Sequence, residues 1–300
     1  MPRKNVLLFY LAFGIIIPGL VLGFFFHLNE PFLKEALLKK QDLAFIIKSF
    51  FQVTLIENEE KNSRVIVLTY HDLINSKPIN GSQLNITDFI AHMDYLYHNN
   101  YRTLSLSEFL FYYQQKNFPP RSILLTFDDG YESFYDRAYP ILKQYGFKAV
   151  IFPVVGYTPG LQQRHLWVKH LSFHQIRLMI KDSNLIDVGV HTFDLHYKEN
   201  KKPALYRQKG ESPADYQARL TKDLRMAKDL LELETGQPVI ALSWPFGKTN
   251  GPARKIALSL GYRLIFTIHP APVTPETPLD KIPRYLIDNG SLEDLKRILN

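Results

Sequence analysis

The sequence contains no cysteine among its 300 residues. Disulfide bonds and thiolate metal sites are therefore excluded, and any bound metal has to be held by His, Asp, Glu or water. The chain also has no internal repeat and no low-complexity tract. With 46% hydrophobic and 22% charged residues, the composition fits a folded protein with a sizeable core, arranged as one large domain or two small ones.

The charge is unbalanced, because basic residues exceed acidic ones and the formal net charge is +7. The chain nevertheless lacks a dense basic cluster interleaved with aromatic residues, so nucleic acid is not expected as a partner. A positive net charge suits a protein that lies beside anionic lipids or cell-wall polymers.

The N-terminus has the pattern of a membrane anchor. No charge interrupts the apolar run from Asn5 to Phe26, which as a helix would span ~33 Å, enough for the hydrocarbon core. Arg3 and Lys4 precede it, so the positive-inside tendency puts the following chain outside the cell. A cleaved signal peptide would have a shorter apolar stretch and a small-residue cleavage site. We therefore expect residues 1–30 to form an uncleaved, single-pass anchor in the cell membrane.

A second apolar segment, from Leu43 to Ile56, is too short to span comfortably and contains Lys48. It predicts a helix that either lies on the bilayer or packs on the protein. Residues 57–63 are polar and end this part. We therefore predict a membrane-proximal helical segment and linker over residues 31–63 and a globular domain over residues 64–300.

Short strand patterns alternate with helical patterns throughout that domain, and a glycine ends several of the helices. Such alternation is typical of βα units with a parallel sheet, and the number of units favours a closed or nearly closed (β/α) barrel. A polar insertion over residues 198–213 is expected to be an exposed loop. The expected strands are 64–71, 122–127, 148–156, 185–191, 239–245 and 263–268, and the expected helices are 86–99, with Thr87 or Asp88 as the cap, 131–146, 171–183, 214–236 and 253–261.

Polar or turn-forming residues end four of the expected strands. In barrels of parallel strands the working site is built at the carboxyl ends of the strands, so these residues point to one shared site. They are His71, the pair Asp128 and Asp129, His191, and the turn Pro245 to Gly247. Adjacent aspartates in a regular strand would face opposite sides, so both can serve one site only where the strand gives way to the turn at Gly130. A plain strand-ending Asp-Asp-Gly turn is the alternative.

The sequence HTFDLH places His191 and His196 five residues apart. They would lie about 140° apart on a helix and on opposite faces of a strand, so only a loop lets both bind one ion. An isolated histidine is more often a solvated or core residue, but this pair follows a strand in a chain that also has Asp-Asp-Gly after a strand. One carboxylate and two imidazoles form a hydrolytic site for zinc or a similar divalent ion.

Together these motifs carry a family resemblance. TFDDG at 126–130, HTFDLH at 191–196 and WPFG at 244–247 resemble the polysaccharide deacetylases, whose domain is called the NodB homology domain. The resemblance covers about Arg64 to the C-terminus. The histidine spacing, WPFG and the early LTYHDL strand resemble the biofilm branch that deacetylates poly-β-1,6-N-acetylglucosamine, a circularly permuted, membrane-anchored type.

The resemblance implies a role for each matching position. Asp129, His191 and His196 would bind the metal, expected to be zinc, with nickel, cobalt and iron as alternatives. Asp128 would be the general base and His71 the general acid. The backbone N–H of Tyr131 or Phe246 would stabilise the oxyanion. WPFG, which is Trp244, Pro245, Phe246 and Gly247, would shape the sugar pocket, with Trp244 or Phe246 facing the pyranose ring.

One motif of the family has no match, since the only tryptophans are Trp167 and Trp244. Residues 281–288 are expected to replace the family's C-terminal tryptophan motif, with Arg284 orienting Asp128. Asp72 and Asp194 are either groups that orient the imidazoles or solvated side chains. The histidines at 165, 170 and 174 are interpreted as surface or substrate-cleft residues.

The expected function is therefore metal-dependent removal of acetyl groups from an extracellular N-acetylglucosamine polymer. The expected partners are that polymer, the membrane, and polysaccharide synthase or export proteins. Two alternatives stay open: deacetylation of peptidoglycan or chitin-type β-1,4 chains, and a non-catalytic glycan-binding scaffold of the export machinery.

Overall fold

The structure is a computed structural model that describes residues 63–161, 167–287 and 290–300. These residues belong to one compact unit, Asn62–Asn300. The predicted anchor and nearly all of the membrane-proximal segment lie outside the described residues. None of the described helices combines the length and apolar composition that a bilayer crossing requires.

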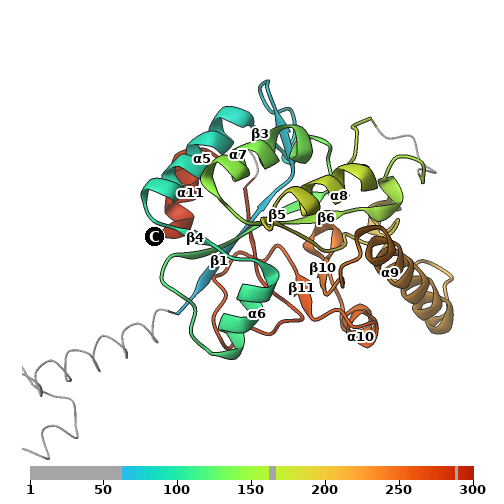
Figure 1. Cartoon of the computed structure of the whole chain (residues 1–300). Coiled ribbons are helices and arrows are strands. Elements are labelled where there is room, and N and C mark those ends of the chain that lie inside the picture. The colour runs from blue at the N-terminus through green and yellow to red at the C-terminus, as the bar shows by residue number, and fades with distance from the viewer. Residues whose placement is uncertain (1–62, 162–166, 288–289) are drawn as a thin grey trace, which may run out of the picture. The chain divides into compact units, whose positions relative to one another are not determined.

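A parallel sheet forms the centre of the unit (Figure 1). Its strand order is β12-β1-β5-β6-β7, and the short β4 also pairs with β5. Every residue of β1 and β5 is buried, as expected for parallel strands that are covered on both faces. The strands of this sheet are β1 (Val65–Tyr70), β4 (Arg102–Thr103), β5 (Ser122–Asp129), β6 (Ala149–Pro153), β7 (Ile186–Val188) and β12 (Tyr285–Leu286).

Two further parallel strands, β10 (Ala241–Ser243) and β11 (Leu264–Phe266), close the sheet into a ring. A single bridge joins Val190, just after β7, to Leu242 of β10, and another joins Phe266 of β11 to Ile282. The chain then runs from Ile282 into β12, which pairs with β1. The predicted barrel of parallel strands is therefore present, with single bridges in place of full strand pairs at two joints.

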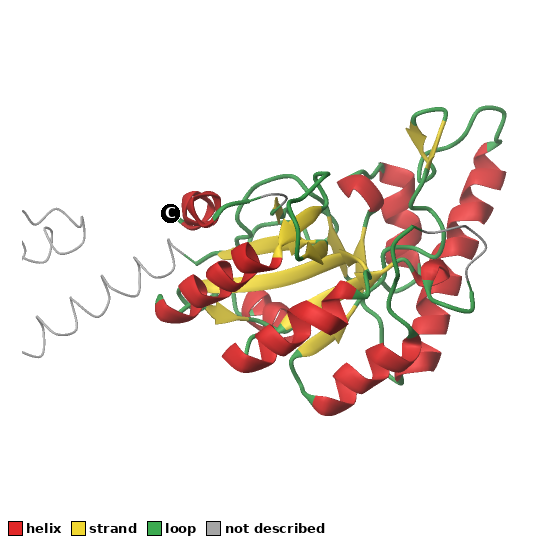
Figure 2. Cartoon of the chain, turned by 90° about the horizontal axis from the view of Figure 1, so that it is seen from above, coloured by secondary structure: helices red, strands yellow, loops and turns green. Residues whose placement is uncertain are grey.

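Helices surround this ring of strands (Figure 2). Two small strand pairs lie outside it. One is the parallel pair of β2 (Asp72–Ile74) and β3 (Gln83–Asn85), and the other is the antiparallel pair of β8 (Lys198–Glu199) and β9 (Lys202–Pro203). The helices are α5 (Ile86–His98), α6 (Leu106–Gln114), the π-helical turn η1 (Phe134–Ala138), α7 (Tyr139–Tyr145), the 3₁₀ turn η2 (Val155–Tyr157), α8 (Phe173–Asp182), α9 (Pro213–Thr235), the 3₁₀ turn η3 (Pro245–Gly247), α10 (Gly251–Ser259) and α11 (Leu292–Leu299).

Local capping explains where several helices begin and end. Helix α5 is capped by Asn85, whose side chain accepts from the Thr87 N–H, so the expectation that Thr87 or Asp88 is the cap is wrong. Asn85 lies two residues before Thr87, just outside the helix, where its carboxamide oxygen reaches a free N–H of the first turn. Helix α7 ends at Gly146 and α9 at Gly236, both in the left-handed conformation that glycine adopts without a Cβ penalty.

Some elements were not predicted from the sequence. Helices α6 and α11 are both short, and the two-residue strands β4 and β12 have too little sequence for a period to emerge. The 198–213 insertion contains the β8–β9 hairpin, and it also buries Ala204 and Leu205. This insertion is therefore anchored on the core and is not wholly an exposed loop.

Successive residues of the central strands face two separate apolar clusters. Ile66, Leu68 and Tyr70 of β1 pack in the larger cluster together with the helices α5, α7, α8 and α9. Val65 and Val67 face the smaller cluster, which also contains Phe152 of β6 and Phe266 of β11. Burial of each large apolar side chain stabilises the fold by about 2 kcal/mol, so the alternation secures the strands from both faces.

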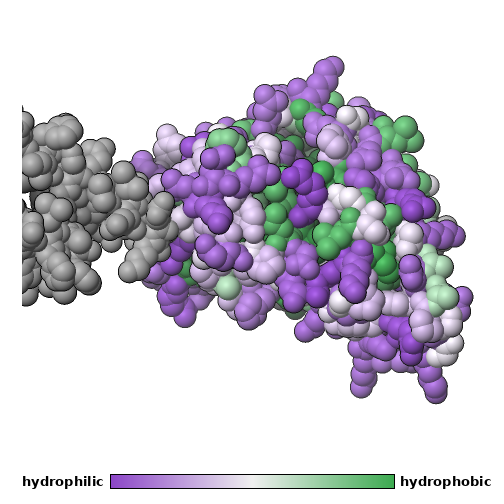
Figure 3. Space-filling view, turned by 90° about the horizontal axis from the view of Figure 1, so that it is seen from below, coloured by the Kyte–Doolittle hydropathy of each residue, from purple (hydrophilic) through white to green (hydrophobic). Residues whose placement is uncertain are grey.

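The surface is predominantly hydrophilic on the face shown in Figure 3, where hydrophobic residues form separate patches near its middle. Among the described residues, the most exposed large apolar side chains are Trp167, Ile79 and Leu233, at 92%, 88% and 79%. They belong to three different segments of the chain, and single exposed apolar residues of this kind are normal for a folded protein.

Glu108 connects three elements and is expected to make stability depend on pH. It closes a capping box with Ser105 at the start of α6 and contacts Lys148 at 2.7 Å and Arg102 at 3.3 Å. Partial burial would raise the pKa of Glu108, but hydrogen bonds from Lys148 and Ser105 outweigh it and lower the pKa to about 2. A carboxyl with a depressed pKa stabilises the fold above its unfolded-state pKa and loses this contribution as pH falls.

Glu108→Gln should therefore lower the unfolding free energy by about 1 kcal/mol at pH 7, after allowance for solvent screening. The difference from the unmodified protein should shrink as pH falls from about 4.5 to about 2. Urea unfolding at several pH values measures it, with the exposed Glu276→Gln as control. A difference that grew towards low pH would contradict the assignment.

Candidate functional site

The carboxyl ends of neighbouring strands bring the predicted site residues to one edge of the barrel. Tyr70 of β1 lies opposite Phe127 of β5, so His71 follows beside Asp128. On the other side of β5, Asp129 lies opposite Pro153 of β6. The Pro153 carbonyl in turn accepts from the His191 N–H at 2.9 Å. Backbone pairing therefore sets His71, Asp128, Asp129 and His191 side by side before any side chain is considered.

The backbone departs from regular strand geometry at the second of the two adjacent aspartates. Strand β5 continues through Asp129, but Asp129 has φ +69° and Gly130 has φ +74°. A left-handed residue at the strand end turns its side chain out of the alternating pattern, so both carboxylates can serve one site. Gly130 is required here because a Cβ would lie 2.7 Å from Pro153 Cα. The predicted break at the turn is present.

Asp129, His191 and His196 form a compact cluster of metal-ligand type, with all ligand atoms within 4.8 Å of one another. Asp129 Oδ1 lies 3.4 Å from His191 Nε2 and 3.2 Å from His196 Nε2. Tetrahedral ligands at ~2.0–2.1 Å from an ion are about 3.4 Å apart, so these separations match a zinc-type centre. Asp129 Oδ1 is also buried without a hydrogen-bond donor among the described residues. The residues present therefore fit a divalent cation.

The protonation states of these ligands also suit a cation. Burial lowers the pKa of His191 to about 4, so its imidazole is neutral at pH 7 with a nitrogen lone pair available. Burial would raise the pKa of Asp129, but the imidazoles of His196, His71 and His191 outweigh it and the pKa lies below its usual value. A neutral imidazole and an ionised carboxylate are the forms that bind metal ions.

Asp128 is held by a buried cation from the far end of the chain. Arg284 is 0% exposed and donates from Nη1 to Asp128 Oδ1 at 2.9 Å and from Nη2 to Oδ2 at 2.6 Å. Ser243 Oγ donates to the same Oδ2 at 2.9 Å. Burial alone would raise the pKa of Asp128, but Arg284, His191 and His71 outweigh it and the pKa lies well below its usual range. Asp128 is therefore an oriented, ionised carboxylate.

Other bonds fix Arg284 itself in the floor of the site. Its side chain donates to the Thr267 carbonyl at 2.9 Å, to Thr126 Oγ1 at 3.1 Å and to Ser243 Oγ at 2.8 Å. Bidentate arginine–carboxylate pairs of this kind fix orientation as well as charge. The geometry matches the role that the sequence interpretation gave to Arg284.

The loop after β7 brings the two histidines together. Thr192 has φ +71°, a conformation that is uncommon for a β-branched residue, and its Oγ1 accepts from the Leu195 N–H at 3.1 Å. Tyr157 donates to the His196 carbonyl at 3.2 Å. The chain thus turns back within six residues, as a five-residue spacing required.

Sequence reasoning missed Asp223, which contacts this loop from helix α9. Its carboxylate accepts from the backbone N–H groups of Phe193 and Asp194. Burial raises the pKa of Asp223 to about 6. A signal was available in the sequence, because Asp223 lies at helical spacing among the apolar residues of the buried stripe of α9: Tyr216, Leu220, Leu224, Ala227 and Leu231.

Tyr131 follows the aspartates and packs against His170, with ring centroids 5.1 Å apart. Burial, followed by the charge of Asp129, raises the pKa of the Tyr131 phenol above its usual value. Tyr131 and His170 face each other in an isolated antiparallel β-bridge. Its backbone hydrogen bonds run from Glu132 N to the Lys169 carbonyl and from Leu171 N to the Gly130 carbonyl. Tyr131 and His170 are thus a non-hydrogen-bonded pair, and the Tyr131 N–H points away from the 169–171 segment.

The WPFG turn reaches the site through one of its two aromatic residues. The Phe246 ring lies against the His196 ring with centroids 4.7 Å apart and planes tilted by 30°, and the Lys198 ammonium lies 4.8 Å from the Phe246 ring centroid. Trp244 is 0% exposed and Pro245 is buried. The suggestion that Trp244 faces a sugar ring is therefore corrected: its indole is part of the core, and Phe246 alone of the pair is accessible. Gly247 allows the turn to approach Ile268 closely.

The remaining candidates lie in segments that flank the site. Asp72 accepts from Ser133 Oγ at 2.8 Å and from Gln83 Nε2 at 3.3 Å, so it connects β2 to its neighbours. Asp194 is fixed through its backbone by Asp223. His170 is buried, with Nδ1 2.9 Å from the Val168 carbonyl, and His174 is exposed. The histidine at 165 lies outside the described residues.

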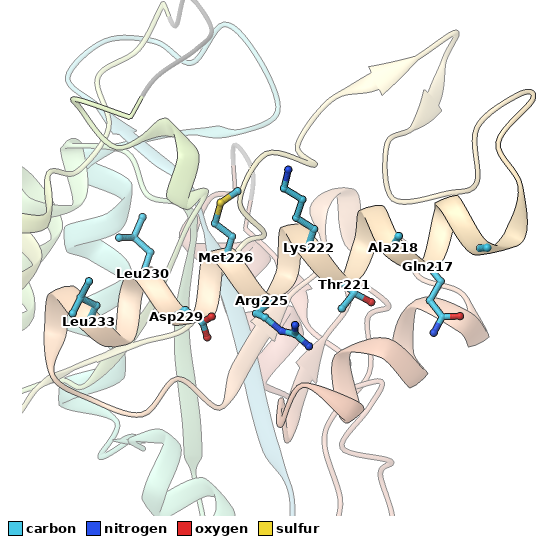
Figure 4. A pocket seen from close by; sticks show the side chains of 10 residues that line it. Gln217, Ala218, Thr221, Lys222, Arg225, Met226, Asp229, Leu230 and Leu233 are labelled. Atoms are coloured by element: carbon cyan, nitrogen blue, oxygen red, sulfur yellow. The ribbon is translucent and has the colours of Figure 1, made fainter.

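A separate groove runs along the outer face of α9 (Figure 4), lined by Gln217, Lys222, Arg225 and Met226 among others. It contains none of the predicted site residues. Most of its side chains are exposed on the helix surface, so it is not a candidate for the chemistry.

Comparisons with known proteins agree with this geometry. The family model described as "Polysaccharide deacetylase" matches residues 115–265, half of the chain. A relative from Staphylococcus epidermidis, called poly-beta-1,6-N-acetyl-D-glucosamine N-deacetylase, is 28% identical over 256 residues, which cover 79% of this chain and 83% of the relative.

Two solved structures share the fold. The BpsB deacetylase domain from Bordetella bronchiseptica has a TM-score of 0.65 and 26% identity, covering 76% of this chain and 97% of that domain. IcaB from Ammonifex degensii has a TM-score of 0.68 and 24% identity, covering 79% of this chain and 97% of that protein. The fold expected from the sequence motifs is therefore confirmed for the described part of the chain.

Proposed function

We propose that this chain, which belongs to the polysaccharide deacetylase family, removes acetyl groups from the N-acetylglucosamine units of poly-β-1,6-N-acetyl-D-glucosamine. The observation that carries the proposal is the convergence of Asp129, His191 and His196 on one point, with the Arg284-bound Asp128 beside them. The Staphylococcus epidermidis relative is named for this activity, which supports the choice of substrate.

A divalent cation held by Asp129, His191 and His196 would supply Lewis acidity to the acetyl amide. Zinc is the expected ion because the ligand set and spacing suit it, with nickel, cobalt and iron as alternatives. Asp128 accepts the proton of the attacking water. Its carboxylate is ready to do so because the Arg284 guanidinium keeps it ionised despite its burial.

His71 donates a proton to the leaving amine. It follows β1 directly beside Asp128, and its charge lowers the pKa of both aspartates, so it lies within electrostatic reach of the reacting groups. The Tyr131 N–H, which points away from the neighbouring segment, stabilises the developing oxyanion. Phe246 offers the sugar an apolar contact at the rim.

Acetate release from a β-1,6-linked N-acetylglucosamine oligomer tests the proposal. The purified protein should release acetate, a chelator should abolish the release, and zinc or cobalt should restore it, because the ligand cluster then regains its cation. Faster release from β-1,4-linked oligomers would transfer the assignment to peptidoglycan or chitin-type chains. Binding of the oligomer by the metal-loaded protein without any acetate would indicate a glycan-binding scaffold and refute the enzyme.

The proposed location is the outer face of the cell membrane, with residues 1–30 as a single-pass anchor and residues 31–63 as the link to a domain over 64–300. The uncharged run from Asn5 to Phe26 supports it. There the enzyme would act on polymer delivered by synthase or export proteins, and its cationic product would adhere to anionic surfaces. Protease added to intact cells should remove the domain; full resistance would place it inside.

A further inference from the structure

The histidine loop, defined as residues 191–196, is held from two sides. On its carbonyl side, the segment after β6 donates from Val155 N to Thr192 O at 3.1 Å and from Gly156 N to Phe193 O at 2.9 Å. Gly156 permits this approach, because a Cβ there would lie 2.7 Å from the Phe193 carbonyl oxygen.

Asp223 of α9 holds the opposite, amide side of the loop. Its Oδ1 accepts from Phe193 N at 2.9 Å and its Oδ2 accepts from Asp194 N at 2.8 Å. The carboxylate is only 9% exposed and sits between Leu220 and Leu224 on the buried stripe of the helix. Two consecutive N–H groups converging on one carboxylate specify the direction of the chain between the two histidines.

We propose that Asp223 is a positioning residue for the metal centre: by binding the Phe193 and Asp194 amides, it keeps His191 and His196 directed at Asp129. The inference rests on the proposed function, because it assigns Asp223 to the cation site that this function needs. Among the described residues, the hydrogen bonds of the Asp223 carboxylate go to these two loop amides and not to the predicted ligands.

The physical reason lies in the shape that the loop must keep. Thr192 is in the left-handed region, which a β-branched residue leaves unless neighbouring bonds hold it. Without the carboxylate, two partly buried N–H groups would lose their acceptor, and the loop would rotate to expose them to water. The His196 ring would then move away from Asp129, to which its Nε2 is now 3.2 Å distant.

Asp223→Asn tests the proposal in the full chain, because the carboxamide keeps the size but replaces one acceptor by a donor. Titration of the metal-free protein with zinc should give a dissociation constant raised about 10- to 100-fold. Hydrogen exchange of the Phe193 and Asp194 amides, measured without metal, should become faster. Asp229→Asn removes the same charge from the outer face of α9, where Figure 4 shows it, and should change neither quantity.

Zinc affinity and exchange rates equal to those of the unmodified protein would overturn the proposal. If Asp223→Asn does not fold, hydrogen exchange of the unmodified metal-free protein is the test. The Phe193 and Asp194 amides should then be protected from exchange, and rapid exchange would overturn the inference. Failure of the proposed function looks different, since the unmodified protein would then bind zinc but release no acetate while the two amides remained protected.

Discussion

Asp128→Asn is expected to lower kcat for acetate release by about 10²- to 10⁴-fold, the usual contribution of a general base. An asparagine has nearly the same shape but cannot accept the proton of the attacking water. The three predicted ligands, Asp129, His191 and His196, remain in place, so zinc should still bind with an affinity close to that of the unmodified protein. Steady-state kinetics on a defined oligomer and zinc titration measure both quantities.

Loss of structure has to be separated from loss of the base, because the variant leaves the buried Arg284 without its carboxylate. Circular dichroism and thermal unfolding at the assay temperature provide that check, and the exposed Asp136→Asn serves as a matched substitution after the same strand. Full activity in a folded Asp128→Asn protein would refute the assignment of the base.

Arg284→Met should lower the free energy of unfolding by about 3–5 kcal/mol, the usual cost of removing one partner from a buried ion pair. The methionine fills similar space, but Asp128, which is 3% exposed, keeps a charge with no cation beside it. The Thr267 carbonyl also loses a donor. Activity should fall as well, since the base is no longer oriented. Urea unfolding measures the free energy.

A double-mutant cycle separates the ion pair from the packing of the arginine. Asp128→Asn combined with Arg284→Met should be less destabilised than the sum of the single changes, because the uncompensated charge is absent. Arg254→Met removes a partly exposed pair with Asp280 at 3.0 Å and should cost only about 1 kcal/mol or less. Strict additivity in the cycle would show that Asp128 and Arg284 do not interact energetically.

Much of the barrel could be predicted from the sequence because its signals are local. The apolar runs at 65–70 and 122–127 are long enough to show as buried strands, and Gly146 and Gly236 end helices through their own backbone freedom. Helix α6 and the paired strands β4 and β12 were missed, since the two strands have two residues each. Pairing with longer neighbours, which is a tertiary interaction, stabilises such short strands.

The sequence by itself determined which chemistry was available. It has no cysteine, and it places two histidines after one expected strand and two aspartates after another. These residues predict a metal site with oxygen and nitrogen ligands. The tertiary structure decided which atoms meet. Three features depend on contacts between residues far apart in the chain: the left-handed turn at Asp129, the burial of Trp244 and the hydrogen bonds from the histidine loop to Asp223. No local pattern encodes such contacts, because burial and hydrogen-bond partners arise only when distant segments pack together.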